Sequence, residues 1–232
     1  MTEVRMPEVR MPEVLMTGDR MTDAFAHKAA AWDDNPVRVA VARAFHKAIL
    51  PLVGPAANRA VLDFGCGTGL LGLLFAGAAR SVDLVDTSTA MAEVLRGKIA
   101  AQGLTNVSVR LGELSDLALP EGSFDLVVSL NALHHIPDIP LVLAQLRRLG
   151  APGGHFMVAD LMTTDMVNGD GSFHGAESVP HNGFDPVALS GQFHAAGFEV
   201  LGVREHHIIR KPDASGALRD YPQFLLHARQ RR

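Results

Sequence analysis

The stretch with the most distinctive chemistry is Asp63-Phe64-Gly65-Cys66-Gly67-Thr68-Gly69, where glycine recurs at every second position after a carboxylate. Glycine allows positive φ angles and close approach of a ligand to the backbone. We expect a buried helix over Leu70–Phe75, whose first N–H groups would be unpaired. A dinucleotide-binding turn, G-x-G-x-x-G, would place its third glycine at Leu70 instead of Gly69. The turn therefore favours a ligand with an ammonium group, which Asp63 would attract, over a pyrophosphate, which it would repel.

A second carboxylate, Asp86, ends an apolar stretch about 20 residues after the glycine turn. We expect Ser81–Asp86 to be the strand adjacent to the one that ends at Phe64. An acid at the tip of that strand can accept two hydrogen bonds from ribose hydroxyls. The two motifs together indicate a ligand that carries both an ammonium group and a ribose.

Histidines are the candidates for a general base, because their ordinary pKa lies near neutral pH. Four of the 11 histidines fall in predicted loops at the carboxyl ends of strands, the ligand edge of an open α/β sheet, namely His134, His135, His174 and His181. We expect His174, His181 and His135 to be catalytic candidates. The alternative is that the His134-His135 pair packs and hydrogen-bonds the loop after the fourth strand. No spacing matches a metal-ligand pattern, so we expect no metal site.

Composition restricts the class of protein. The chain has 232 residues, enough for one large α/β domain, and 47% of them are hydrophobic. The single cysteine, Cys66, allows no internal disulfide, which predicts a reducing, cytoplasmic location. The net charge of −4 argues against a nucleic-acid partner. No apolar run reaches the roughly 18 residues of a membrane span, and the N-terminus lacks the apolar core of a signal peptide.

The chain divides into a leader and one domain. Methionine recurs every five residues over 1–22, a period that fits neither helix nor strand, so we predict a flexible repetitive leader. The alternative is an arm that folds over the site or a neighbouring subunit. The domain, 23–232, comprises cap helices (23–57), a cofactor-binding core (58–160), a substrate loop (161–184) and a C-terminal helix with a hairpin (185–232).

Apolar strands alternate with helical stretches through the core. We expect strands at 61–64, 81–86, 107–112, 124–130 and 156–160, and helices at 36–50, 90–102, 140–149 and 186–196. Two last strands, 198–209 and 224–228, would form a hairpin. The pattern predicts an α/β fold with a doubly wound, mostly parallel seven-stranded sheet, helices on both faces and an antiparallel last strand.

The stretch Val61–Gly69 resembles motif I, V-L-D-x-G-C-G-T-G, of the class I S-adenosylmethionine-dependent methyltransferases. Asn131–Asp138 is similar to the family's motif IV, and Gly112-Glu113-Leu114 stands where the family often has Gly-Asp-Ala. Glu113 departs from that pattern and leaves its contact to the adenine amino group open. The resemblance implies S-adenosylmethionine as cofactor and S-adenosylhomocysteine as product. The residues it implies for cofactor binding are Asp63, Gly65, Cys66, Gly67, Gly69, Asp86, Thr87, Met91, Gly112, Glu113, Leu114, Asn131 and Trp32, with Trp32 and Met91 equally compatible with core packing.

The implied reaction is transfer of the methyl group to a small-molecule acceptor by in-line displacement. Because the sulfonium already activates the methyl group, positioning can account for most of the acceleration, and a base is needed only for a protonated acceptor. A nicotinamide-dependent oxidoreductase is one alternative, disfavoured by the missing third glycine and Asp63. A non-catalytic S-adenosylmethionine-binding module is another. The sequence predicts no oligomeric state.

Overall fold

The computed structural model describes residues 23, 25–163, 173–175, 177–213 and 215–231. The predicted leader, 1–22, and residues 164–172 of the predicted substrate loop lie outside the described residues. The helices, with η for a 3-10 helix, are η1 (Ala29–Asp34), α1 (Pro36–Val53), η2 (Gly72–Phe75), α2 (Thr89–Gln102), η3 (Leu133–His135), α3 (Ile139–Leu149) and α4 (Pro186–Ala195). The strands are β1 (Ala60–Phe64), β2 (Ser81–Asp86), β3 (Val107–Leu111), β4 (Phe124–Leu130), β5 (Gly150–Leu161), β6 (Phe198–Pro212) and β7 (Leu218–Gln230).

The strands form one seven-stranded sheet in the order β3-β2-β1-β4-β5-β7-β6. Neighbours from β3 to β5 pair in parallel, whereas β7 is antiparallel to both β5 and β6. The predicted fold class, including its antiparallel last strand, is confirmed. Because β1, β2, β4 and β5 run the same way, their carboxyl ends share one edge of the sheet, and the candidate site residues follow those ends.

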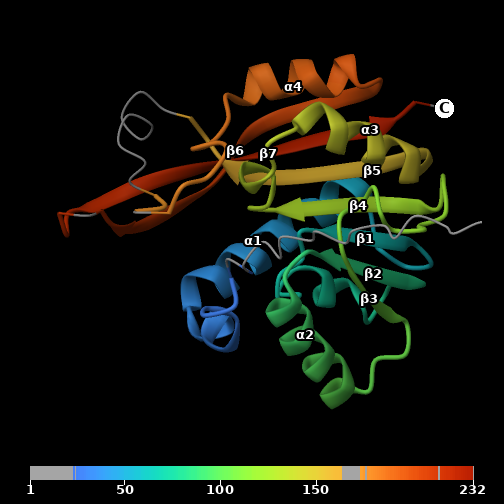
Figure 1. The fold of residues 1–232 in the computed structure, drawn as a ribbon. Helices are drawn as coiled ribbons and strands as arrows, with labels where there is room; N and C mark the ends of the chain where they lie inside the picture. The colour runs from blue at the N-terminus through green and yellow to red at the C-terminus, as the bar shows by residue number, and fades with distance from the viewer. Residues whose placement is uncertain (1–22, 24, 164–172, 176, 214, 232) are drawn as a thin grey trace, which may run out of the picture.

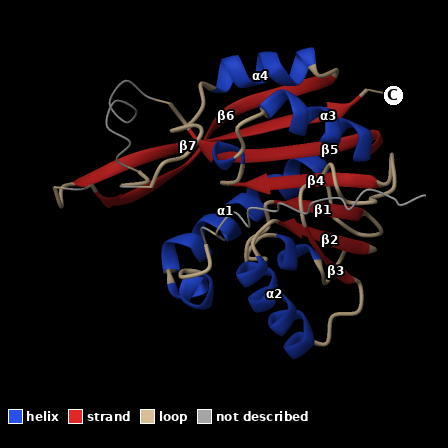
Figure 2. Cartoon of the chain, viewed as in Figure 1, coloured by secondary structure: helices blue, strands red, loops and turns tan. Residues whose placement is uncertain are grey.

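Helices cover both faces of the sheet (Figures 1 and 2). On one face α1, η2 and α2 bury Phe45, Phe75 and Leu95 in a cluster that includes Val61 of β1. On the other face α3 and α4 pack in a cluster that includes Leu62. Consecutive strand residues point to opposite faces, so an apolar strand such as β1 supplies both cores.

Side-chain caps begin all four of the described α-helices, with Asp138 capping α3. Asn35 Oδ1 accepts from the Val37 N–H at 2.9 Å, and Ser88 Oγ accepts from the Met91 N–H at 3.1 Å. Asp185 Oδ1 caps α4 by accepting from the Val187 N–H at 2.7 Å. These caps satisfy N–H groups that lack a partner within the helix. Gly103, with φ 61°, ends α2 in the left-handed conformation.

Five elements differ from the sequence-based prediction, namely η2, α1, β5, β6 and β7. The expected helix over Leu70–Phe75 is only the 3-10 turn η2, in which Gly72 lies close to the Asp63 side chain. Helix α1 continues through Pro51 to Val53, since a proline in the last turn removes a single hydrogen bond. The last two strands reach Pro212 and Leu218, and Figure 1 shows this pair extending beyond the rest of the sheet.

Candidate cofactor and acceptor site

The turn after β1 exposes backbone that only glycine can supply. Gly65, Gly67 and Gly69 have φ angles of 70°, 53° and 80°, all in the left-handed region. A Cβ at Gly65 would lie 2.3 Å from the Cβ of Ala132, and one at Gly69 would lie 2.5 Å from Leu95 Cδ1. Packing therefore excludes side chains at Gly65 and Gly69. A turn without side chains allows a ligand to approach the backbone closely.

Asp63 lies beneath this turn with a side chain that is only 1% exposed. Its Oδ2 has no hydrogen-bond partner among the described residues. Burial raises the pKa of Asp63 to about 7, the Asp86 charge adds to this effect, and the Gly72 N–H opposes it. Such a carboxyl gains from a nearby cation, which would stabilise its charged form.

Asp86 ties the turn to α2. Its Oδ2 accepts from the Gly67 N–H at 2.6 Å, and its Oδ1 accepts from the Ser88 N–H at 2.9 Å. Burial raises the pKa of Asp86, and these two N–H groups oppose that effect. Asp23, which the sequence analysis did not single out, accepts from Ser88 Oγ at 2.8 Å and from the Ala90 N–H at 3.1 Å. Two carboxylates thus meet at the start of α2.

The remaining cofactor candidates surround the turn in different ways. Met91 and Leu114 are 2% and 3% exposed and belong to the core. Thr87 follows β2, Glu113 lies just after β3, and both are exposed. Gly112, between β3 and Glu113, has φ 139°. Cys66 is buried, and burial raises the pKa of its thiol, so it stays protonated and is unsuited to nucleophilic attack.

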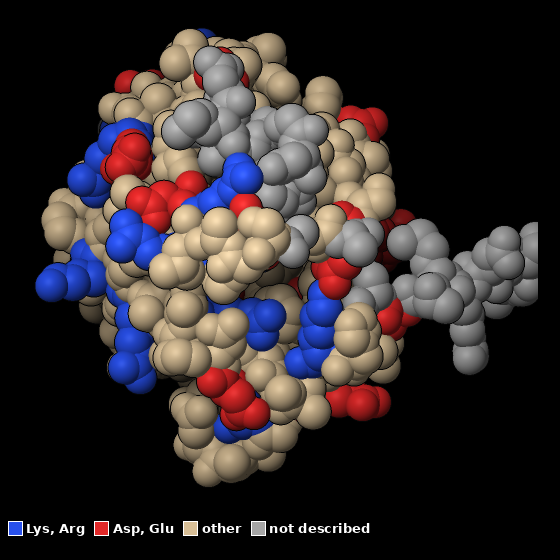
Figure 3. All heavy atoms as spheres, turned by 90° about the vertical axis from the view of Figure 1, so that its left-hand side faces the viewer, with Lys and Arg blue, Asp and Glu red and all other residues tan. Residues whose placement is uncertain are grey.

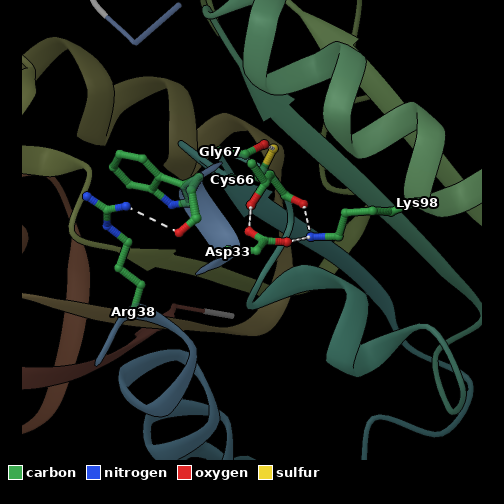
Figure 4. Close-up of polar contacts among 7 residues, drawn as sticks. Asp33, Arg38, Cys66, Gly67 and Lys98 are labelled. Atoms are coloured by element: carbon green, nitrogen blue, oxygen red, sulfur yellow. Dashed lines mark hydrogen bonds and ion pairs between the residues drawn. The ribbon is translucent and has the colours of Figure 1, made fainter. Parts of the chain in front are cut away.

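The segment before α1 is fastened over the glycine turn (Figure 4). Asp33 Oδ1 accepts from Thr68 Oγ1 at 2.5 Å, and Lys98 Nζ lies 2.6 Å from both Asp33 Oδ2 and the Thr68 carbonyl oxygen. Next to Asp33, the Arg38 guanidinium lies 3.7 Å from the centre of the Trp32 ring. The segment that carries Trp32 is therefore attached to the turn by polar contacts that the sequence analysis missed, because their partners lie 30 to 65 residues apart.

Three histidines cluster where β4 and β5 end. The His134 ring centre lies 4.0 Å from that of His135 and 4.8 Å from that of His174. His134 Nδ1 lies 2.6 Å from Asp160 Oδ1, and both residues are buried. Asp160 Oδ1 also accepts from the Leu161 N–H at 2.7 Å, which fixes the carboxyl group beside the His134 ring. The structure brings together two of the predicted catalytic residues, His135 and His174, and adds His134 and Asp160.

Burial, together with the neighbouring His134, lowers the pKa of His135 and of His174 to about 4 in each case. These two imidazoles are therefore neutral near pH 7 and each has a nitrogen lone pair that can take a proton. His174 Nε2 is buried and has no partner among the described residues. An unpaired buried nitrogen of this kind is expected where a ligand completes the hydrogen bonding.

His181 has a different position from the other predicted bases. Its Nε2 lies 3.0 Å from the Ile136 carbonyl oxygen, and its backbone N–H donates to the His134 carbonyl oxygen at 3.2 Å. These contacts hold the loop after β4 in place. The sequence analysis gave this structural role as the alternative to catalysis for the His134-His135 pair. Asn131, with φ 54°, is held by Gln223 Nε2, which donates to its Oδ1 at 2.5 Å. Gln223 lies on β7, a long-range partner that no local motif indicates.

Two hollows lie elsewhere on the molecule. A groove of 760 Å³ opens at the opposite edge of the sheet, lined by the C-terminal parts of α3 and α4 and the start of β5. A second, of 490 Å³, is lined almost entirely by apolar side chains of α1 and η2. Neither contains a carboxylate–histidine pair or the glycine turn, so the site described above remains the candidate for chemistry.

Residues 61–154 match the model of a family described as a methyltransferase domain. The chain is therefore similar, over the part that carries the glycine turn, to methyltransferase domains. It is 39% identical over 111 residues to the nocamycin O-methyltransferase of Saccharothrix syringae, an alignment that covers 46% of this chain and 39% of that protein. The chain thus spans well under two thirds of this curated relative's length.

The class I methyltransferase fold also appears in solved structures. A SAM dependent methyltransferase from Aquifex aeolicus has a TM-score of 0.62 and 19% identity, over 86% of this chain and 95% of the other. The [4+2]-cyclase SpnF has a TM-score of 0.67 and 16% identity, over 82% of this chain and 80% of the other. At such identities the likeness shows the fold alone, and the cyclase illustrates that one fold serves different reactions. Among the described residues of this protein, every helix is too short or too polar to cross a bilayer.

Proposed function

We propose that this protein moves a methyl group from S-adenosylmethionine to a hydroxyl group of a small-molecule acceptor. The observation that carries the proposal is the bare glycine turn above the buried, unpaired Asp63 and beside Asp86. A cation-accepting carboxyl and a ribose-accepting carboxylate at one turn fit the amino acid and ribose parts of this cofactor. The relative that methylates nocamycin, by its name, supports a small-molecule acceptor.

The residues of the turn fit the cofactor as follows. Gly65, Gly67 and Gly69 leave room for it at the backbone, Asp63 receives its ammonium group, and Asp86 accepts from its ribose hydroxyls. The contacts of Thr87, Met91, Gly112, Glu113, Leu114, Asn131, Cys66 and Trp32 belong to the same proposal. When bound, S-adenosylmethionine supplies an electrophilic methyl group on a sulfonium, and the electron pair of the broken C–S bond stays on sulfur.

The histidine cluster performs the proton transfer on the acceptor side. The acceptor oxygen forms the new C–O bond, and its hydroxyl proton passes to a neutral imidazole, either His174 Nε2 or His135. Asp160 holds His134 and the start of the loop after β4 in place, with its Oδ2 accepting from the His134 N–H at 3.2 Å. Asp160 and His134 therefore act as positioning residues, while His174 and His135 are the candidates for contact with the acceptor.

Two measurements test this function. Calorimetry should show binding of S-adenosylmethionine and S-adenosylhomocysteine but not of NAD. Incubation of the full chain with methyl-labelled S-adenosylmethionine and pools of hydroxylated metabolites should give labelled ethers. Binding of NAD without S-adenosylhomocysteine would favour the oxidoreductase alternative, and cofactor binding without label transfer across the pools would favour the non-catalytic module.

A further inference from the structure

A continuous row of rings runs along the acceptor side of the site. Successive ring centres are 5.8, 5.2, 5.9, 5.0 and 5.1 Å apart. We call this row the aromatic belt; its members, in spatial order, are Trp32, Phe25, His135, His174, Phe173 and Tyr221. The belt joins the segment before α1, the loop after β4, the loop before α4 and β7. Tyr221 is fully buried and anchors the belt in the core, whereas the other five rings are partly exposed. Partly exposed rings at these spacings form a surface against which a planar ligand can pack.

A cation lies at each end of the aromatic belt. Arg38, in the first turn of α1, covers Trp32, while Lys211 of β6 lies 4.1 Å from the ring centre of Phe173 and 5.7 Å from that of Tyr221. Lys211 Nζ also donates to the Phe173 carbonyl oxygen. Figure 3 views the molecule from the left-hand side of Figure 1. Lys and Arg side chains are spread over this face, with Asp and Glu side chains between them.

The two cations lack counter-charges of their own. Among the described residues, neither Arg38 nor Lys211 has a carboxylate within ion-pair distance. The nearby carboxylates are engaged, since Glu177 pairs with Lys28 and Asp33 pairs with Lys98 at 2.6 Å.

Burial is the main influence on the pKa of both cations. Burial lowers the pKa of Lys211, Glu177 opposes this, and the Arg38 and Lys28 charges add to it. Burial also lowers the pKa of Arg38, and the Asp33 and Glu177 charges oppose it. An anion bound close to Lys211 would stabilise its charged form.

Buried polar atoms near the belt complete the pattern. His174 Nε2 and Gln223 Oε1 have no hydrogen-bond partner in the described part of the chain. One is a nitrogen of the belt itself, and the other belongs to the side chain that holds Asn131 at the end of β4. A hydroxyl group on a ligand could donate to either atom. The surface thus offers rings, a hydroxyl-binding position and two cations.

We propose that the methyl acceptor is an aromatic hydroxy acid, whose ring packs on the aromatic belt beside His174 and whose carboxylate is bound by Lys211. The proposal rests on the proposed function, because it names the acceptor class for the same site. Lys211 lies 4.1 Å from the ring centre of Phe173, the neighbour of His174, and supplies a point charge to a carboxylate there. The competing explanation is that Lys211 only covers the rings and remains solvated.

The first experiment compares acids with their uncharged esters. Calorimetry on the protein saturated with S-adenosylhomocysteine would measure binding of 2-, 3- and 4-hydroxybenzoate and 4-hydroxycinnamate, each beside its methyl ester. We expect at least one acid to bind tenfold or more tightly than its ester, with an affinity that falls as NaCl is raised. If no acid exceeds its ester, the acceptor class is wrong.

Variants then locate the charge. Lys211→Met keeps an apolar stem over the rings but removes the charge, and Arg38→Gln removes the charge at the other end of the belt. We expect Lys211→Met to weaken binding of the preferred acid about tenfold and leave its ester unchanged, while Lys211→Arg and Arg38→Gln retain acid binding. Arg43→Gln, at an exposed position on α1, is a second control. Acid binding that is unaffected in Lys211→Met would refute the assignment.

The two proposals fail in distinguishable ways. S-adenosylhomocysteine affinity should be the same in all these variants, because none of them alters the glycine turn, Asp63 or Asp86. Absence of S-adenosylhomocysteine binding to the parent protein would overturn the proposed function itself. Normal S-adenosylhomocysteine binding without a preference for acids over esters would overturn only the aromatic hydroxy acid.

Discussion

Replacement of Asp63 by Asn should make the ligand-free protein more stable and its cofactor binding weaker. Asp63 is buried with an unpaired oxygen, and its pKa in the folded protein is raised to about 7 from an ordinary value of 3.8. A carboxyl with a raised folded-state pKa binds a proton in the folded state that it has lost in the unfolded state. Ionisation of Asp63 therefore costs stability as the pH rises through 7, and Asn cannot ionise.

The magnitude follows from the pKa. Between pH 6 and pH 8 the folded carboxyl, with a pKa of about 7, loses its proton, whereas the unfolded carboxyl is ionised throughout. Integration over this range gives a loss of about 1.4 kcal/mol, the equivalent of one pH unit of proton binding. The parent protein should lose this amount between pH 6 and pH 8 beyond any loss in Asp63→Asn, because other titrating groups are common to both proteins.

Urea unfolding at pH 6 and pH 8 measures this difference. Asp116→Asn, at an exposed position, is the matched control and should behave as the parent does. At pH 7 we also expect Asp63→Asn to weaken S-adenosylmethionine binding about tenfold, because a charged partner of the ammonium group is lost. Equal pH dependence in the parent and in Asp63→Asn would show that Asp63 does not titrate in this range, and the electrostatic reasoning would be wrong.

The remaining predictions concern the other parts of the site. Asp86→Ala should weaken S-adenosylhomocysteine about tenfold to a hundredfold in calorimetry, and an unchanged affinity in a folded variant would remove Asp86 from the ribose site. His174→Ala should lower turnover roughly a hundredfold or more with cofactor affinity preserved, whereas His181→Ala should disturb acceptor and cofactor binding together; near-normal turnover in both would leave alignment alone to drive the reaction. Because the pKa of His174 and of His135 is lowered to about 4, turnover should lose no activity to histidine protonation between pH 9 and pH 6, and an acid limb near pH 6.5 would contradict this. Lys98→Met should release Asp33 and change the fluorescence of the single tryptophan, Trp32, with S-adenosylhomocysteine dissociating severalfold faster; unaltered fluorescence and dissociation would show that the contact does not hold the segment.

Sequence alone determined the features that depend on local chemistry. Alternate glycines, a strand ending in Asp86 and apolar runs separated by capped helices predicted the cofactor turn and the order of elements, because each is specified within a few neighbouring residues. The predicted helix start at 36 and helix end at 102 agree with the structure, where Asn35 caps α1 and Gly103 ends α2, both local effects. The expected helix after Gly69 was wrong, and in the structure Gly72 lies close to the Asp63 side chain there.

Only the tertiary structure decided which groups share the acceptor side. His134 and Asp160 are 26 residues apart, Gln223 and Asn131 are 92 apart, and Lys98 and Asp33 are 65 apart. No spacing rule connects such pairs, because parallel strands joined by helices bring distant segments to one edge. The sequence indicated that histidines lie at that edge, but it suggested only their ordinary pKa. In the folded protein, burial and the neighbouring histidines lower the pKa of His135 and of His174. The unpaired charges of Arg38 and Lys211 likewise exist only because the fold surrounds both with rings and commits the neighbouring carboxylates to other cations.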